Sequence, residues 1–283
     1  MKSTEHVSSL RIPFEVILPS GIGLERFVII HMVHGRGTCI VDAGVRGSED
    51  LILNELLTEE LPSPEALLLT HTHPDHIGGV KALHDRLGVN ILCPAGERDW
   101  LEDVAIQAKE RPVPGFERLV GGSAPVGTEV KDGFRLELGG VEIEALATPG
   151  HSRGSISYRV LEDDAIISGD AVPLTSEPPI YDDAIASLES VRKLMDLDPV
   201  HLLPAWHEPL HGSAAKGHLH AGETMILRFH EAVVATLRES PYADDESACS
   251  KTVKALGFPS TAVNPLVIRT FRAHRRALTR WPG

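Results

Sequence analysis

Residues 71–76 read His71-Thr72-His73-Pro74-Asp75-His76, and this short stretch decides how the whole chain is interpreted. It follows residues 66–69, a wholly apolar run that predicts a buried central strand, so the stretch forms a loop at that strand's carboxyl end. Imidazole and carboxylate groups together suit zinc, iron or manganese. Alternate side chains of an extended loop point the same way, so the first two histidines can bind one metal ion while the aspartate and the last histidine turn towards a second. The alternative is a histidine-rich surface loop without a metal.

The composition is that of an ordinary globular protein, with 42% apolar and 24% charged residues. At 283 residues the chain is long enough for one large core, or for one core with a small appended unit. The formal net charge of −13 makes the chain a poor general match for nucleic acid or an anionic membrane, although a local basic patch is compatible with it. The 15 histidines are unevenly spread, which directs attention to metal chemistry.

Three features predict a cytoplasmic protein. Cys39, Cys93 and Cys249 are far apart, odd in number and form no C-x-x-C motif, which argues against a disulfide framework. No apolar signal core follows the first residues, because charged residues such as Arg11 and Glu15 interrupt it. No run of 18 apolar residues occurs, so we expect no membrane-spanning helix and no membrane partner.

Apolar periodicity and turn residues divide most of the chain into two strand-rich halves, each with helices. We expect two mixed sheets packed together with helices outside, which is an α+β fold. In the first half we predict strands over residues 27–33, 38–41 and 66–69, and helices over residues 48–58 and 77–87. In the second half we predict strands over residues 134–138, 141–146, 156–158, 165–167 and 200–203, and a helix over residues 182–195.

The chain changes character near residue 213. Apolar residues at helical spacing predict helices over residues 218–237 and 247–256, and Asn264-Pro265 supplies an N-cap and a first-turn proline for a last helix. We therefore expect a main domain over residues 1–212 and a C-terminal helical extension over residues 213–283. The last helix carries a basic set that is either a solvated face or a contact for phosphates, namely Arg269, Arg272, Arg275, Arg276 and Arg280.

Several motifs together resemble those of the metallo-β-lactamase superfamily. Residues 71–76 with Gly78-Gly79 resemble its H-x-H-x-D-H-x-G-G signature, and Asp42-Ala43-Gly44 resembles its early D-x-G. Thr148-Pro149-Gly150-His151-Ser152 resembles its T-P-G-H-[ST] loop, and Ser168-Gly169-Asp170 resembles its G-D strand end. The motifs occur in the family's order at predicted strand ends, and the resemblance covers about residues 14–212.

The resemblance implies an αββα sandwich with a site for two divalent metal ions. It implies six ligands, which are His71, His73 and His151 for one ion, Asp75 and His76 for the other, and Asp170 as a bridge. It also implies that Asp42 supports the ligand loop. Zinc is the expected metal, with iron or manganese as alternatives.

The last ligand of the family departs from its usual pattern. The family carries P-G-H-G-x-P there, whereas this chain carries Pro204-Ala205-Trp206-His207-Glu208-Pro209. Trp206 occupies the histidine position, and its indole N–H cannot bind a metal ion. We predict that His207 turns in and completes the second site. A contribution from Glu208 or His211, or a mononuclear centre, are the alternatives.

These features predict a hydrolase that uses a metal-activated hydroxide on a small ester, thioester, lactone or phosphodiester. Asp75 would be a catalytic residue that orients the water and later carries a proton. One alternative is a mononuclear iron oxidoreductase that resembles the persulfide dioxygenases of the same superfamily, and another is nucleic-acid processing through the basic last helix. Tyr181 and Trp206 are candidate substrate contacts. We expect a small-molecule substrate, and we consider a homodimer.

Overall fold

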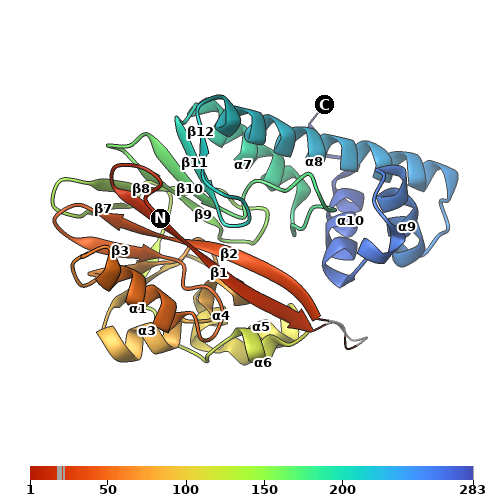
Figure 1. Cartoon of the computed structure of the whole chain (residues 1–283). Helices are drawn as coiled ribbons and strands as arrows, with labels where there is room; N and C mark the ends of the chain where they lie inside the picture. The colour runs from red at the N-terminus through yellow and green to blue at the C-terminus, as the bar shows by residue number, and fades with distance from the viewer. Residues whose placement is uncertain (18–20, 22, 283) are drawn as a thin grey trace. The chain divides into compact units, whose positions relative to one another are not determined.

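The computed structural model describes residues 1–17, 21 and 23–282 (Figure 1). The chain divides into two compact units. Unit 1 comprises Met1–Ala147, Ile156–Gly169 and Val200–His211, and unit 2 comprises Thr148–Ser155, Asp170–Pro199 and Gly212–Gly283. A boundary between independent domains at residue 212 stays a prediction, because a compact unit need not fold alone.

The first sheet of unit 1 has six strands, which are β1 (Val7–Ile17), β2 (Gly23–His34), β3 (Thr38–Val41), β4 (Ala66–Leu68), β5 (Asn90–Pro94) and β6 (Thr128–Val130). The strands lie in sequence order. The pairs from β1 to β3 are antiparallel, and the pairs from β3 to β6 are parallel. Strands β3 and β4 are wholly buried, as their continuous apolar sequence predicts for the parallel part of a sheet.

The second sheet of unit 1 also has six strands, which are β7 (Arg135–Glu137), β8 (Glu142–Ala147), β9 (Ile156–Val160), β10 (Ala165–Gly169), β11 (His201–Pro204) and β12 (Leu210–His211). Strands β10 and β11 pair in parallel, whereas all other neighbours are antiparallel. The end of β8, the start of β9 and the end of β10 therefore lie side by side, at the same end of the strands of this sheet.

The two sheets of unit 1 pack on each other, and the first sheet packs on helices with its opposite face. Leu68 shares a buried apolar cluster with Tyr158 and Ile167 of the second sheet. Its neighbour Leu67 points the other way, into a cluster with Ile52 of the helical layer, because successive strand residues face opposite sides. The helices of unit 1 are α1 (Glu49–Thr58), α2 (Pro74–Ile77), α3 (Val80–Leu87), α4 (Arg98–Glu102), α5 (Val104–Glu110) and α6 (Phe116–Leu119).

Unit 2 contains α7 (Ala184–Asp196), α8 (Ser213–Glu239), α9 (Asp245–Ala255), the 3-10 helix η1 (Ser260–Ala262) and α10 (Pro265–Ala277). Phe229, Cys249 and Phe271 join α8, α9 and α10 in one buried cluster. The Asn264 side chain accepts hydrogen bonds from the first two free amides of α10, which confirms it as the predicted N-cap. In the described part of the chain, no helix has the length and apolar character that a membrane crossing needs.

The predicted α+β sandwich of two mixed sheets with helices is confirmed. Its local elements differ from the structure in several places, and helices α4, α5 and α6 were not predicted. Strand β1 was not predicted, although it pairs along its whole length with β2. The helix predicted over residues 77–87 corresponds to α3, which begins only at Val80, because Ile77 ends the separate helix α2 and Gly78 and Gly79 lie between the two helices. A Cβ at Gly78 would lie 2.2 Å from the carbonyl oxygen of Leu119, so this close backbone contact requires glycine.

Candidate metal centre

The loop after β4 buries three histidines. His71, His73 and His76 are 1%, 2% and 0% exposed. Helix α2 begins inside the motif, since His73 is its extended N-cap and Pro74 takes the first helical position, where the fixed φ of proline suits a helix start. Asp75 follows, and its Oδ2 lies 3.5 Å from His76 Nε2. The ring centroid of His71 lies 4.0 Å from that of His76 and 4.4 Å from that of His73, so the loop gathers its imidazoles.

Asp42 holds this loop from the end of the neighbouring strand β3. Its Oδ1 accepts a hydrogen bond from Thr70 N at 2.8 Å. Its Oδ2 accepts one from the Thr70 hydroxyl at 2.8 Å and lies 2.8 Å from His76 Nδ1. The backbone φ of Asp42 is 64°, in the left-handed region that aspartate tolerates better than most residues. Asp42 thus links the backbone of the loop to the imidazole of His76.

A second buried carboxylate, Glu97, holds the residue between the first two histidines. Its Oε2 accepts hydrogen bonds from Thr72 N at 2.7 Å and from the Thr72 hydroxyl at 2.8 Å. Gln107 Nε2 donates to the Thr72 carbonyl. Sequence reasoning missed Glu97, which follows β5 and lies 25 residues from the Thr72 that it holds. Trp100 is 5% exposed, and its ring centroid lies 6.2 Å from that of His73.

Thr70 connects this loop to the second sheet. Its carbonyl oxygen accepts a hydrogen bond from Ile156 N at 2.8 Å. A Cβ at Gly169 would lie 2.8 Å from the Thr70 Cβ, so the close approach requires glycine, which here has a φ of 50°. Ile156 follows the loop that carries His151, and Gly169 precedes Asp170. These contacts therefore bring the ends of both segments to the loop after β4.

His151 and Asp170 follow strands of the second sheet at the end where β8 and β10 both finish. His151 lies between β8 and β9, and Asp170 directly follows β10. His151 Nδ1 lies 2.8 Å from the Ile180 carbonyl oxygen, and its Nε2 lies 3.3 Å from Asp170 Oδ2. Gly150 has a φ of 131°, and a Cβ there would lie 2.4 Å from a backbone nitrogen near the start of α7. The glycine of the T-P-G-H sequence is thus needed for this close contact.

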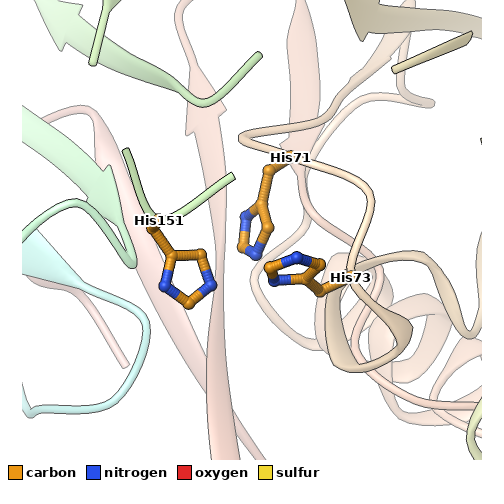
Figure 2. A group of neighbouring side chains, drawn as sticks. All are labelled: His71, His73 and His151. Carbon is orange, nitrogen blue, oxygen red and sulfur yellow. The ribbon is translucent and has the colours of Figure 1, made fainter. Parts of the chain in front are cut away.

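Figure 2 shows His71, His73 and His151, and one ligand atom from each lies within 4.8 Å of the others. His71, His76 and Asp170 form an adjoining group by the same measure. Five of the predicted ligands therefore belong to groups that could hold a metal ion, and Asp75 lies beside His76.

The donor set fits a divalent metal ion of the zinc type. Three of the imidazoles have an Nδ1 partner, namely Thr70 Oγ1 for His71 at 3.0 Å, Asp42 Oδ2 for His76 at 2.8 Å and the Ile180 carbonyl for His151 at 2.8 Å. When Nδ1–H donates in this way, the lone pair lies on Nε2, and such an outer partner fixes the ring orientation of metal-binding histidines. Imidazoles with carboxylates are the ligands that zinc commonly uses.

The loop after β11 carries the two residues that replace the expected last ligand. Trp206 packs edge-on against Phe14 of β1, with ring centroids 6.1 Å apart. His207 is half-buried, and its Nδ1 lies 2.8 Å from the carbonyl oxygen of Glu208. Among the described residues, no group of possible metal ligands includes His207. Its role as a ligand stays a prediction.

The two alternative ligands on this side have partners elsewhere. Glu208 Oε1 accepts a hydrogen bond from Arg11 Nη1 at 2.7 Å. His211 is exposed, and its Nδ1 lies 2.7 Å from that of His201 on the paired strand.

Tyr181, the candidate substrate contact, lies inside unit 2. It is 2% exposed, and its hydroxyl lies 2.6 Å from His274 Nε2. Burial raises the pKa of the Tyr181 hydroxyl and lowers the pKa of His274. Both groups are therefore neutral near pH 7.

Buried histidines beside carboxylates at the strand ends of a two-sheet sandwich define a metal-binding α+β protein. The model of the metallo-beta-lactamase superfamily matches residues 27–206, and the chain belongs to that superfamily.

Known relatives agree with this assignment. The probable metallo-hydrolase YqgX of Bacillus subtilis (strain 168) is 33% identical over 127 residues, which are 44% of this chain and 58% of that protein. A hydroxyacylglutathione hydrolase of Hyphomonas neptunium is 29% identical over 140 residues, 49% of this chain and 46% of that protein. The chain thus spans about half the length of the curated relatives it matches. A metallo-beta-lactamase family protein from Thermus thermophilus shares the fold, with a TM-score of 0.72 at 19% identity over 96% of this chain and 93% of that one.

Proposed function

We propose that this protein is a metal-dependent hydrolase whose active site is the candidate metal centre. The observation that carries the proposal is the group of His71, His73 and His151, whose ligand atoms lie within 4.8 Å of one another. Superfamily membership supports it, as do relatives named metallo-hydrolase and hydroxyacylglutathione hydrolase.

The proposal assigns two divalent ions, and zinc is the metal that the donor set favours. The ligands are His71, His73 and His151 for the first ion, Asp75, His76 and His207 for the second, and Asp170 for both. The short distance between His151 and Asp170, 3.3 Å from Nε2 to Oδ2, supports their sharing an ion.

A divalent ion in this site would lower the pKa of bound water and stabilise negative charge at the attacked centre. Asp75 would handle the proton, since its side chain keeps 17% exposure beside His76. Its carboxylate would accept a hydrogen bond from the attacking water, orient it and then receive its proton. The buried carboxylates of Asp42 and Glu97 would keep the ligand loop in place while the substrate binds.

The substrate we propose is a small molecule with an ester, thioester, lactone or phosphodiester bond. An acyl thioester comes first, because two relatives are named for acylated glutathione. We also propose a cytoplasmic location, which the three buried free thiols of Cys39, Cys93 and Cys249 support.

Elemental analysis of the purified protein, followed by a panel of thioesters, lactones and phosphodiesters, tests the proposal. We expect zinc bound to the chain, and hydrolysis that stops when a chelator removes the metal and returns when zinc is added. Full activity in the metal-free protein would contradict the proposal.

Trp206 favours a second candidate function, because it stands where the second ion's last ligand is expected. A mononuclear centre with two imidazoles and a carboxylate suits an iron oxidoreductase. One iron per chain with oxygen uptake on a persulfide would support this candidate.

Nucleic-acid processing has less support, because arginines of α10 have acidic partners inside unit 2. Arg269 donates to both carboxylate oxygens of Asp182, while Arg272 and Arg275 donate to Asp245. These ion pairs favour the structural interpretation of the basic helix. RNA binding that weakens with salt would reverse this preference.

A further inference from the structure

Residues 180–183, here called the bracket segment, hold the His151 loop. The carbonyl oxygen of Ile180 lies 2.8 Å from His151 Nδ1. The backbone nitrogens of Asp182 and Asp183 both donate to the Gly150 carbonyl, at 2.8 Å and 3.1 Å. The ring orientation of His151 and the backbone next to it therefore depend on the same four residues.

Helix α10 holds the main chain of the bracket segment. The Thr270 hydroxyl accepts a hydrogen bond from Tyr181 N at 3.0 Å and donates one to Tyr181 O at 3.1 Å. Arg276 Nη2 donates to the Asp182 carbonyl at 2.9 Å. Thr270 is 0% exposed, so water cannot replace these bonds without opening the structure.

Helix α10 also holds two side chains of the bracket segment. Arg269 Nε and Nη2 donate to Asp182 Oδ1 and Oδ2 at 3.0 Å and 2.9 Å, a bidentate pair of the kind that fixes geometry as well as charge. The Tyr181 hydroxyl lies 2.6 Å from His274 Nε2. On its other side, His274 Nδ1 lies 3.2 Å from His230 Nδ1 of α8.

The helix can act as a support because it is itself anchored. Phe271 of α10 packs with Phe229 of α8 in the buried cluster of unit 2, and both side chains are 0% exposed. The bracket segment is also tied to α7, since Asp183 Oδ1 accepts hydrogen bonds from Ile185 N and Ala186 N. Buried packing on α8 and helix capping on α7 leave the segment little freedom to shift.

We propose that α10 positions the metal ligand His151 through the bracket segment, with Arg269, Thr270 and His274 as positioning residues. This inference rests on the proposed metal centre, and it gives the C-terminal helices a role in the site. None of the three residues contacts the reacting atoms. Each acts on the metal through the Ile180 carbonyl, which determines the nitrogen and the direction that His151 presents.

A matched pair of arginines on α10 tests the inference. Arg269→Ala removes the bidentate contact to the bracket segment, whereas Arg272→Ala removes a contact to Asp245 in α9. Zinc affinity, measured by competition with a chelator, should fall by up to about 10-fold for Arg269→Ala, the lower end of the effect of losing an outer partner, because the Ile180 carbonyl itself stays in place. Arg272→Ala should stay within about two-fold of the wild type, because exposed ion pairs contribute little.

Thr270 provides a conservative check that separates positioning from folding. Thr270→Val leaves Tyr181 N without its acceptor and should weaken zinc binding, while Thr270→Ser keeps the hydroxyl and should restore it. The absorption spectrum of the Co(II) form should change for Thr270→Val and not for Thr270→Ser, since it reports the geometry of the ligands. Thermal unfolding of the metal-free variants shows that each is folded before metal is added.

Two outcomes have distinct meanings. If Arg269→Ala and Thr270→Val bind zinc like the wild type while His151→Ala does not, the inference is wrong and the metal centre stands. If His71→Ala and His151→Ala also bind zinc like the wild type, the proposed metal centre is wrong and the inference fails with it.

Discussion

Two loops of unit 1 follow buried strands, and they differ in what holds them. The loop after β4 has three buried histidines, and carboxylates from other strand ends, Asp42 and Glu97, accept its hydrogen bonds. The loop after β11 has Trp206, which packs on aromatic side chains of the first sheet, and His207, whose Nδ1 partner is the carbonyl of the next residue.

The orientation of a metal-binding histidine therefore depends on its hydrogen-bond partner as well as on the histidine itself. Asp42, from another strand, fixes the imidazole of His76 directly and that of His71 through Thr70 before any metal arrives, because it belongs to the packed sheet. The carbonyl of Glu208 moves with the loop that carries His207. We therefore expect the ion held by His71, His73 and His151 to bind more tightly than the ion that would need His207.

Replacing His71 and His73 with alanine removes two ligands from the loop after β4, and this change should have the largest effect. The variant loses two imidazoles of one group, so its zinc affinity should fall by more than the ~10–100-fold that follows loss of an outer partner alone. Hydrolysis should fall below detection. Elemental analysis and a rate measurement check this, and a double variant that keeps its metal and its rate would refute the site.

His207→Ala tests the other loop and should have the next largest effect. We expect the variant to lose the more weakly bound of the two ions and to keep the first, because the ligands of the first ion are untouched. His211→Ala is the matched control, since it removes an exposed histidine paired with His201. Metal content and rate that stay at the wild-type level in His207→Ala would remove His207 from the ligand set.

Asp42→Asn tests whether the cross-strand partner organises the loop. Asparagine keeps an oxygen for Thr70 N but turns an amide donor towards His76 Nδ1, which already needs an acceptor. His76 must then change tautomer or turn, so metal affinity should fall about 10–100-fold. Asp164→Asn is the control, since Asp164 also has a left-handed φ, 47°, but lies on the turn between β9 and β10. Equal zinc affinities in the two variants would contradict this role for Asp42.

The ligand loop could be predicted from the sequence because its signals are local. Histidine spacing, the apolar strand before it and the glycines after it all lie within residues 66–79. The N-cap Asn264 was predicted for the same reason, since a cap acts on amides two and three residues away. The later motifs around His151 and Asp170 were found through the family resemblance and not through periodicity.

The supports of the site could not be predicted in this way, because they join residues that are far apart. Glu97 lies 25 residues from Thr72, and Tyr181 lies 89 residues from Thr270. Which carboxylate meets which loop depends on the order of strands in the sheet, and a single sequence does not specify that order.

Glu97→Gln should have the smallest effect. It tests whether Glu97, in addition to Asp42, is needed to hold the loop after β4 more firmly than the loop after β11. Glutamine can still offer one oxygen to Thr72, but it loses the stronger bonds of a charged acceptor, so we expect about 1–2 kcal/mol less free energy of unfolding. Zinc affinity should fall only a few-fold, because Thr72 is not itself a ligand. Glu102→Gln, at the end of α4, is the control, because this exposed carboxylate pairs with Arg98 and accepts a hydrogen bond from Val126 N but does not contact the ligand loop, so zinc affinity should stay unchanged. If Glu97→Gln lowers stability and leaves zinc affinity intact, Asp42 alone accounts for the difference between the two loops.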